Sequence, residues 1–259
     1  KHSWPVHHHA HPVVSIIVPV APLHQRYLVD ALDSCLAQTV VNWEAIVIDD
    51  SRDASMPEVI QSHPFARVYH SLGKGTGRAR NIGIMHAHGQ FVLFLDADDI
   101  LEPSALEDML RAYVERDGGY IYSDCKIPGD PKKFDLPGET IEAVDYDQET
   151  FIRSGYTDNM PGCHSVTILV ARADLDQTEG FDETLAYWED WKLPLELAVL
   201  GIRGVRVPKP LLVYRFNTGV RRHASKAQEG AIKEALRQQF EPYTTGEKQM
   251  CGCTGGNGG

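Results

Sequence analysis

Three carboxylates follow directly after an apolar run. Asp96, Asp98 and Asp99 come after Phe91–Leu95. Five consecutive apolar residues suit a strand that is covered on both faces, and ligands of open α/β sheets bind outside the carboxyl ends of such strands. Asp96 and Asp98 are two residues apart, so both can face one divalent cation, which prefers hard oxygen ligands. The spacing therefore suggests a cation that bridges to phosphate.

This acidic motif has two other interpretations. Asp is common in turns and at the start of helices, so Asp96 and Asp98 could simply cap a turn and the helix expected after Pro103. An Asp-x-Asp after an apolar strand also resembles the motif of phosphatases of the haloacid dehalogenase type, in which the first Asp is a nucleophile. The motif alone does not decide among the three.

Acids also follow a second apolar run and open a later helix. Asp49 and Asp50 come directly after Ala45–Ile48, where a turn is the simplest explanation and a ligand contact is the functional one. Glu189 and Asp190 precede apolar residues at helical spacing, and the helix dipole favours acids in a first turn. Both pairs therefore need a wider pattern before a function can be assigned.

Strands and helices alternate along the chain. Apolar runs predict strands, and apolar residues at helical spacing predict helices. Strands are expected at 14–19, 45–48, 67–70, 91–95, 119–124, 165–170 and 211–216. Helices are expected at 24–38, 57–62, 77–87, from 103 and at 189–200, with a last amphipathic helix after Ser225. The order predicts an α/β fold with a Rossmann-like, mostly parallel sheet flanked by helices.

Composition limits the classes of partner. The chain has 259 residues, of which 42% are hydrophobic, so it can bury a substantial core. Its formal charge of -11 argues against nucleic acid or an anionic membrane as a general partner. No stretch reaches the roughly 18 apolar residues of a membrane span, and no signal peptide is evident. With five cysteines, an odd number, reduced thiols and a cytoplasmic location are expected.

The ends differ in composition from the rest. Residues 1–12 are rich in His and are expected to be a linker or arm, which suggests a larger polypeptide. Residues 13–225 are expected to form one domain with two halves, 13–124 and 125–225, because the regular alternation of elements fades after residue 124. A C-terminal helix is expected at 226–240 and a flexible Gly/Cys tail at 241–259.

Six short motifs occur in an order that resembles the family-2 glycosyltransferases of the GT-A fold. The resemblance covers nearly all of residues 13 to 225. Each motif is weak alone, and six in order are a strong signal. The motifs are Ser15–Pro19, Glu44–Ser51, Gly77–Gly83, Phe94–Asp99, Gly180–Glu183 and Trp188–Leu193.

The resemblance implies that residues 13–124 form the nucleotide-sugar half and residues 125–225 the acceptor half, with UDP the expected nucleotide. Pro19 and Asp50 would line the base pocket, and Arg80 would lie near the diphosphate, where a guanidinium can bind two oxygens. Asp96 and Asp98 would bind Mg²⁺ or Mn²⁺ on the diphosphate. A basic cluster at and after the end of the last expected strand consists of Arg215, Arg222 and His223. Within it, His223 is the expected third metal contact.

The resemblance also implies an inverting transfer to an acceptor hydroxyl. Asp190 would be the general base that takes the proton of this hydroxyl. Trp191, His164 and Glu189 are tentative acceptor contacts, since an indole can stack on a sugar ring. The acceptor would be a glycan, a lipid-linked molecule or a protein. The Gln-x-x-Arg-Trp motif of processive polysaccharide synthases is absent from the basic cluster.

Three alternatives remain open. A nucleotidyltransferase that makes sugar nucleotides usually has a Gly-rich basic loop after its first strand, where this chain has Ala21–His24. The haloacid-dehalogenase-like phosphatase has little further support. A sugar- or nucleotide-binding module without catalytic activity is compatible with the sequence.

Overall fold

The structure is a computed structural model. It describes residues 11–53, 59–129, 139–145, 147–154, 167–185, 188–215 and 221–248. The side chains of residues 59, 61, 149, 153–154 and 221–228 are not described. The expected arm at 1–12 and tail at 241–259 therefore lie largely outside the described residues. Within the described part of the chain, no helix combines the length and the apolar character that crossing a membrane requires.

One mixed sheet of nine strands runs through the described residues, in the order β3-β2-β1-β4-β8-β6-β9-β5, with β7 beside β6. β1 to β4 are mutually parallel, whereas β8 is antiparallel to both β4 and β6. The strands are β1 (Val14–Val20), β2 (Trp43–Asp49), β3 (Ala66–His70), β4 (Phe91–Phe94), β5 (Ile100–Leu101), β6 (Tyr120–Lys126), β7 (Thr140–Ile141), β8 (Leu169–Ala171) and β9 (Gly204–Val213).

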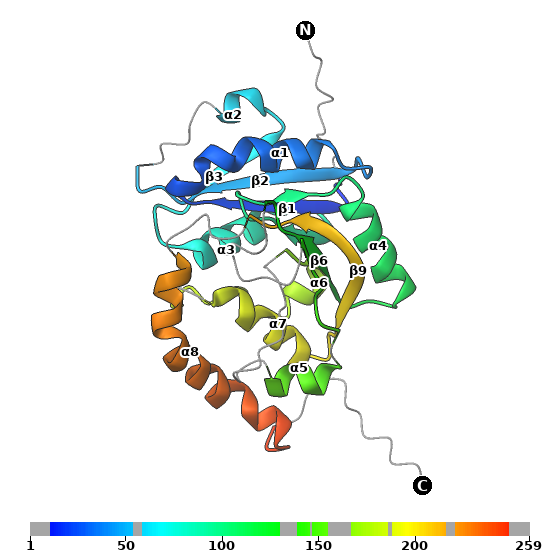
Figure 1. Ribbon diagram of the computed structural model, residues 1–259, viewed down its shortest axis with the longest axis vertical. Coiled ribbons are helices and arrows are strands. Elements are labelled where there is room, and N and C mark those ends of the chain that lie inside the picture. The colour runs from blue at the N-terminus through cyan, green and yellow to red at the C-terminus, as the bar shows by residue number, and fades with distance from the viewer. Residues whose placement is uncertain are drawn as a thin grey trace.

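Helices cover both faces of this sheet (Figure 1). They are the 3₁₀ helix η1 (Pro22–Tyr27), α1 (Leu28–Leu36), α2 (Val59–Ser62), α3 (Thr76–His86), α4 (Ala105–Glu115), α5 (Gln148–Ser154), α6 (Arg172–Leu175), α7 (Glu189–Val199) and α8 (Arg221–Thr244). The α/β architecture, mostly parallel and flanked by helices, confirms the predicted fold class.

The alternation of side chains along β1 explains why the sheet is covered twice. Ile16 and Val18 pack in the core that also contains residues of α1 and α4. Ile17, between them, packs in the core that contains residues of α3 and α7. Because successive side chains of a strand point to opposite faces, an apolar run such as Val14–Val20 needs a helical layer on each face.

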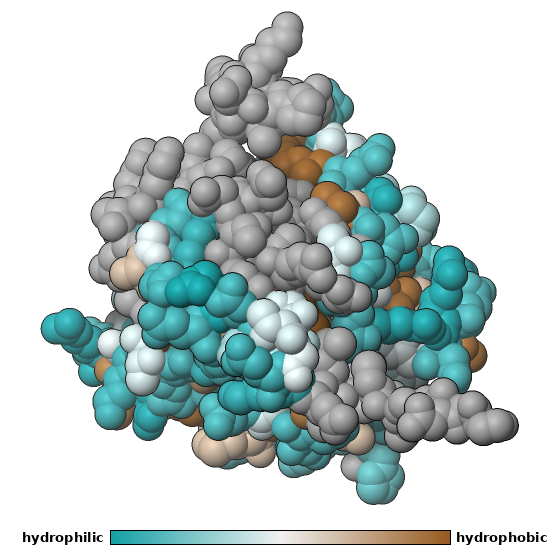
Figure 2. Space-filling model, turned by 90° about the horizontal axis from the view of Figure 1, so that it is seen from below, coloured by the Kyte–Doolittle hydropathy of each residue, from teal (hydrophilic) through white to brown (hydrophobic). Residues whose placement is uncertain are grey.

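A third apolar cluster joins α5, α7 and α8. Ile232, Leu236 and Phe240 of α8 are buried against Phe151 of α5 and Leu195 of α7. Figure 1 shows α8 as a long helix along the side of the molecule, away from β2 and β3. On the face in Figure 2, the described surface is largely hydrophilic, with small, separate hydrophobic areas. The apolar side chains of α8 named above are therefore buried against α5 and α7.

Several expected boundaries change. The last strand is Gly204–Val213 rather than 211–216, and the last helix is Arg221–Thr244 rather than 226–240, so it includes the first residues of the expected tail. The strands β5 and β7 and the helices α5 and α6 were not predicted. β9 of the later part of the chain pairs with β6, so the sheet is continuous around the expected boundary at residue 124. The division into two functional halves stays a prediction.

Candidate active site

A cleft lies at the carboxyl ends of β1, β2 and β4. Its volume is about 350 Å³ when the solvent at its open mouth is included. Parallel strands bring their carboxyl ends to the same edge of a sheet, which is where ligands of such folds bind. The cleft is lined by Pro19, Val20, Ala21, His24, Asp50, Thr76, Asp96 and Ala97. Three of the predicted donor residues, Pro19, Asp50 and Asp96, therefore share one cleft.

The loop between β3 and α3 orients Asp50. Ser71 Oγ donates a 2.5 Å hydrogen bond to Asp50 Oδ1, and the backbone N–H of Gly75 lies 3.2 Å from each carboxylate oxygen. Gly75 has a φ of 97°, which side chains of L-residues rarely adopt, so glycine allows its N–H to point at Asp50. The carboxylate of Asp50 is held by two donors at the edge of the cleft.

The neighbouring Asp49 has a different environment. It is fully buried, and it accepts hydrogen bonds from the backbone N–H of Ser51 at 2.9 Å and from Ser51 Oγ at 2.8 Å. His70 Nδ1 lies 3.3 Å from Asp49 Oδ2, the oxygen that also accepts the hydrogen bond of Ser51 Oγ. These contacts match the interpretation of Asp49 as a turn residue.

Asp96–Asp99, which we call the acidic loop, concentrates charge beside the cleft. Asp98 is buried, with His24 Nδ1 3.8 Å from its Oδ1. Burial raises the pKa of Asp99 well above its usual value, and the charges of Asp96 and Asp98 raise it further. The 3.0 Å hydrogen bond from the backbone N–H of Arg215 does not offset this. Among the described residues, Asp99 Oδ2 has no hydrogen-bond partner.

This donor set fits a hard divalent cation. Carboxylate oxygens of Asp96 and Asp98 are the ligands that Mg²⁺ and Mn²⁺ prefer, and a cation would relieve the repulsion in the acidic loop. The described residues contain no group of three or more His, Cys, Asp or Glu that could hold a metal ion by itself. The site therefore fits a metal that takes its other ligands from phosphate and water. The side chain of His223 is not among those described, so its metal contact stays a prediction.

Arg80 is buried among acids. Its Nη2 donates a 2.8 Å hydrogen bond to Asp96 Oδ1, and its Nη1 donates a 3.0 Å hydrogen bond to Glu189 Oε1. Burial disfavours the charged guanidinium, but the charges of Asp96, Glu189 and Asp190 outweigh this and raise its pKa. The structure thus gives Arg80 protein carboxylates as partners, and its predicted contact with the diphosphate stays a prediction.

The first turn of α7 brings Asp190 close to this cluster. Trp188, just before the helix, has a φ of 69°, a strained value for a bulky residue and one that is concentrated at functional sites. Glu189 is buried, and Asp190 is half-buried and within electrostatic reach of Arg80. Trp191 is half-buried, with its ring centre 5.5 Å from that of Trp188.

The acceptor contacts are less defined. His164 lies outside the described residues, and Glu189 is engaged by Arg80. The sequence reasoning missed His24 and Thr76, which line the cleft. Their places in the sequence could have identified them. His24 comes soon after β1 and Thr76 is the first residue of α3 after β3, so both lie near the carboxyl ends of parallel strands.

Comparison with known proteins gives a family model and several relatives. The model described as glycosyl transferase family 2 matches residues 15–177. A chondroitin synthase of Escherichia coli is 29% identical over 194 residues, which cover 73% of this chain and 27% of that protein. A chondroitin synthase of Pasteurella multocida is 28% identical over 200 residues, 75% of this chain and 20% of that protein. This chain spans about a fifth to a quarter of these relatives.

Solved structures share the fold. S. aureus TarS in complex with UDP-GlcNAc superposes with a TM-score of 0.60 at 20% identity, covering 89% of this chain and 72% of that one. A mannosyltransferase from Pyrobaculum calidifontis in complex with GDP-Man and Mn²⁺ gives a TM-score of 0.61 at 18% identity, covering 93% and 69%. At these identities the likeness shows the GT-A-like fold.

Proposed function

Because this chain belongs to glycosyl transferase family 2, we propose that it transfers a sugar from a nucleoside diphosphate sugar to an acceptor hydroxyl, with inversion at the anomeric carbon. One observation carries this proposal. Asp50 and Asp96 line one cleft, and Arg80 connects Asp96 to the helix turn that holds Asp190. The groups needed for a donor and for a base thus belong to one connected site.

Asp50 and Pro19 are the proposed contacts of the nucleotide base. A carboxylate held by Ser71 and Gly75 can accept the imide hydrogen of uracil, which favours UDP. The complex of TarS with UDP-GlcNAc supports a UDP-sugar, whereas the mannosyltransferase complex contains GDP-Man, so both nucleotides belong in the test.

Asp96 and Asp98 are the residues that would hold Mn²⁺ or Mg²⁺. When bound, the cation supplies Lewis acidity that neutralises charge on the departing diphosphate. The Mn²⁺ in the complex of the structurally similar mannosyltransferase supports a metal at this site. Asp98 is the proposed main ligand, and one oxygen of Asp96 also accepts a hydrogen bond from Arg80.

Asp190 is the proposed general base. It takes the proton of the acceptor hydroxyl while that oxygen bonds to the anomeric carbon. The bond from this carbon to the diphosphate oxygen breaks on the opposite face, so one displacement inverts the configuration. Glu189 is less suited to this role because it is buried and paired with Arg80. Trp191 is the proposed platform for the acceptor sugar.

The acceptor and the wider context are also proposals. The chondroitin synthase relatives favour a glycan acceptor over a lipid-linked or a protein one. Because the chain spans only part of those relatives, we propose that it works within a larger polypeptide. A cytoplasmic location stays a prediction.

The direct test is product analysis. The chain is incubated with Mn²⁺ and a panel of UDP-sugars and GDP-mannose, with candidate glycans or with water as the acceptor. Release of nucleoside diphosphate, absent in Asp190→Asn, is expected. Release of phosphate without a nucleotide would instead indicate a phosphatase, and formation of pyrophosphate from a sugar phosphate and a nucleoside triphosphate would indicate a nucleotidyltransferase. Nucleotide binding without any release would indicate an inactive binding module.

A further inference from the structure

The side chain of Arg80 is almost completely buried. Its side chain is 2% exposed, and its guanidinium carbon lies 5.1 Å from the centre of the Phe181 ring. Its two terminal nitrogens contact Asp96 and Glu189, which belong to different parts of the fold. A planar guanidinium can join two carboxylates in fixed directions, which a single ammonium group does less well.

The same helix also holds the loop that leads toward α7. Asn81 Nδ2 donates a 2.8 Å hydrogen bond to the carbonyl of Phe181, whose N–H donates a 2.8 Å hydrogen bond to Asn81 Oδ1. Lys192 of α7 donates a 2.9 Å hydrogen bond to Asp182 of this loop. Helix α3, residues 180–183 and α7 are therefore fastened together, and Arg80 extends this unit to the acidic loop.

Close packing supports a fixed arrangement. A Cβ added to Gly77 of α3 would lie 3.1 Å from the carbonyl oxygen of Asp182 and 3.5 Å from Cγ of Glu189. The rings of Phe181 and Phe94, the last residue of β4, meet edge to face with centres 4.9 Å apart. The first turn of α7 and the end of β4 thus both pack around the position of Arg80.

We propose that Arg80 is a positioning residue that fixes the first turn of α7 relative to the acidic loop, and thereby sets where Asp190 stands relative to the donor. This inference rests on the proposed function. Arg80 does not need to contact the diphosphate in this role. Its removal leaves Asp96, Glu189 and Asp190 without the cation they share, so the three acids repel one another and the turn loses its anchor.

Hydrogen exchange tests the anchor without any ligand. In Arg80→Gln, the backbone amides of residues 189–193 are expected to exchange at least about tenfold faster than in the wild type, because local opening becomes easier. Amides of β1 serve as an internal reference. Arg78→Gln is the matched control, since Arg78 lies on the same helix and its 3.0 Å ion pair with Glu183 is exposed. Unchanged exchange at 189–193 would overturn the proposal.

Kinetics separate positioning from donor binding. In Arg80→Gln, UDP affinity with Mn²⁺ is expected to stay within about threefold of the wild type, while turnover of the active UDP-sugar falls about 100-fold, because a misplaced base loses reactive geometry. Arg80→Lys, which keeps the charge, should fold and recover part of the turnover. A loss of UDP affinity as large as the loss of turnover would assign Arg80 to the diphosphate and overturn the proposal.

A double variant tests whether Arg80 acts through its contact with Glu189. Arg80→Gln combined with Glu189→Ala is expected to lose little more turnover than Arg80→Gln alone, because both changes break the same link. Additive losses would contradict the proposal. If the wild-type chain bound no nucleotide, the proposed function would fail, whereas the exchange measurement would still decide on Arg80.

Discussion

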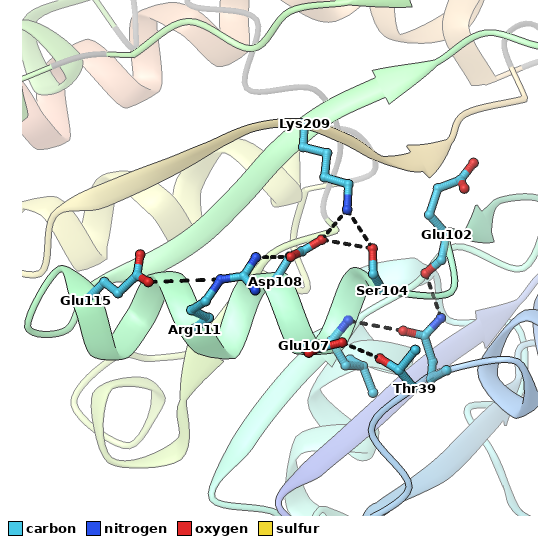
Figure 3. Close-up of polar contacts among 10 residues, drawn as sticks. Thr39, Glu102, Ser104, Glu107, Asp108, Arg111, Glu115 and Lys209 are labelled. Carbon is cyan, nitrogen blue, oxygen red and sulfur yellow. Dashed lines mark hydrogen bonds and ion pairs between the residues drawn. The ribbon is translucent and has the colours of Figure 1, made fainter.

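Two buried aspartates, Asp108 on α4 and Asp99 in the acidic loop, have different partners, and their pKa values shift in opposite directions. Asp108 receives hydrogen bonds from Lys209 Nζ at 2.6 Å and Ser104 Oγ at 2.8 Å, and it pairs with Arg111 (Figure 3). Burial alone would raise its pKa, but these partners outweigh burial and lower it. Asp99 accepts only a backbone N–H among the contacts described for its oxygens, and its pKa is raised.

We propose that this difference separates acids that serve the fold from acids that serve a ligand. Around Asp108 the chain supplies its own cations, so α4 and β9 are joined by a completed network. In the acidic loop, Asp98 and Asp99 are buried beside a cleft and raise the local negative charge. A buried carboxylate needs a counter-charge, so the acidic loop is suited to a cation from solution.

The largest expected effect comes from removing a proposed metal ligand. Asp98→Asn should weaken the binding of UDP in the presence of Mn²⁺ by at least about 100-fold. Loss of a residue that only hydrogen-bonds to a metal ligand already lowers metal affinity by about 10–100-fold, and loss of a ligand should cost at least as much. Isothermal titration calorimetry measures this. Asp108→Asn is the control and should bind like the wild type. Equal affinities in the two variants would remove the distinction between Asp108 and the acidic loop.

Removing the proposed base should act on turnover alone. Asp190→Asn is expected to lower turnover by about 10²–10⁴-fold, the usual contribution of a general base, with little change in UDP affinity. Steady-state release of nucleoside diphosphate, with calorimetry in parallel, checks both quantities. Normal turnover in this variant would mean that another residue takes the proton.

For the free energy of unfolding, we expect Asp108 to contribute more than Asp99 of the acidic loop. Asp108→Ala should lower the free energy of unfolding by about 1–3 kcal/mol, because it breaks a hydrogen-bonded charge cluster. The cost stays moderate because Lys209 and Arg111 are 52% and 55% exposed and can be solvated. Asp99→Asn keeps an acceptor for Arg215 N–H and should change the free energy by less than about 1 kcal/mol. Urea unfolding without metal measures both, and a larger loss in Asp99→Asn would contradict this ordering.

The smallest effect is a pH dependence. The folded-state pKa of Asp108 lies below its ordinary value of 3.8, so its ionised form stabilises the fold above that pH. This contribution is lost as pH falls below 3.8 through the folded-state pKa. The difference in unfolding free energy between wild type and Asp108→Asn should therefore be constant from pH 7 to 5 and shrink below pH 4. A difference that grows on acidification would contradict the lowered pKa.

Sequence reasoning was most successful where the pattern is local. The apolar runs at 14–19, 45–48 and 91–95 predicted parallel strands, and the observed β1 is Val14–Val20. The acids after the second and third of these runs were expected at strand ends, and Asp50 and Asp96 do share a cleft. The strands β5 and β7 are two residues long, too short for periodicity to reveal them. The antiparallel direction of β8 depends on its neighbours β4 and β6, which no local pattern encodes.

The interior of the site was less predictable. The motif around Arg80 was recognised, but its partner Glu189 lies 109 residues away, and each side chain taken alone suggests a different role. The proximity of His24 to Asp98 likewise depends on the position of η1 relative to the acidic loop. Such pairings follow from tertiary packing rather than from residue type or spacing.

The most direct test of the account is thermal melting of the wild-type chain with Mn²⁺ alone, UDP alone, and both together. A ligand that binds the folded state at about 100 times its dissociation constant adds about 2.7 kcal/mol, or roughly 5 °C for a chain of this size. The account predicts that this shift requires Mn²⁺ and UDP together. An equal shift with UDP alone, or no shift with UDP or GDP in the presence of Mn²⁺, would contradict a metal-dependent donor site at the acidic loop.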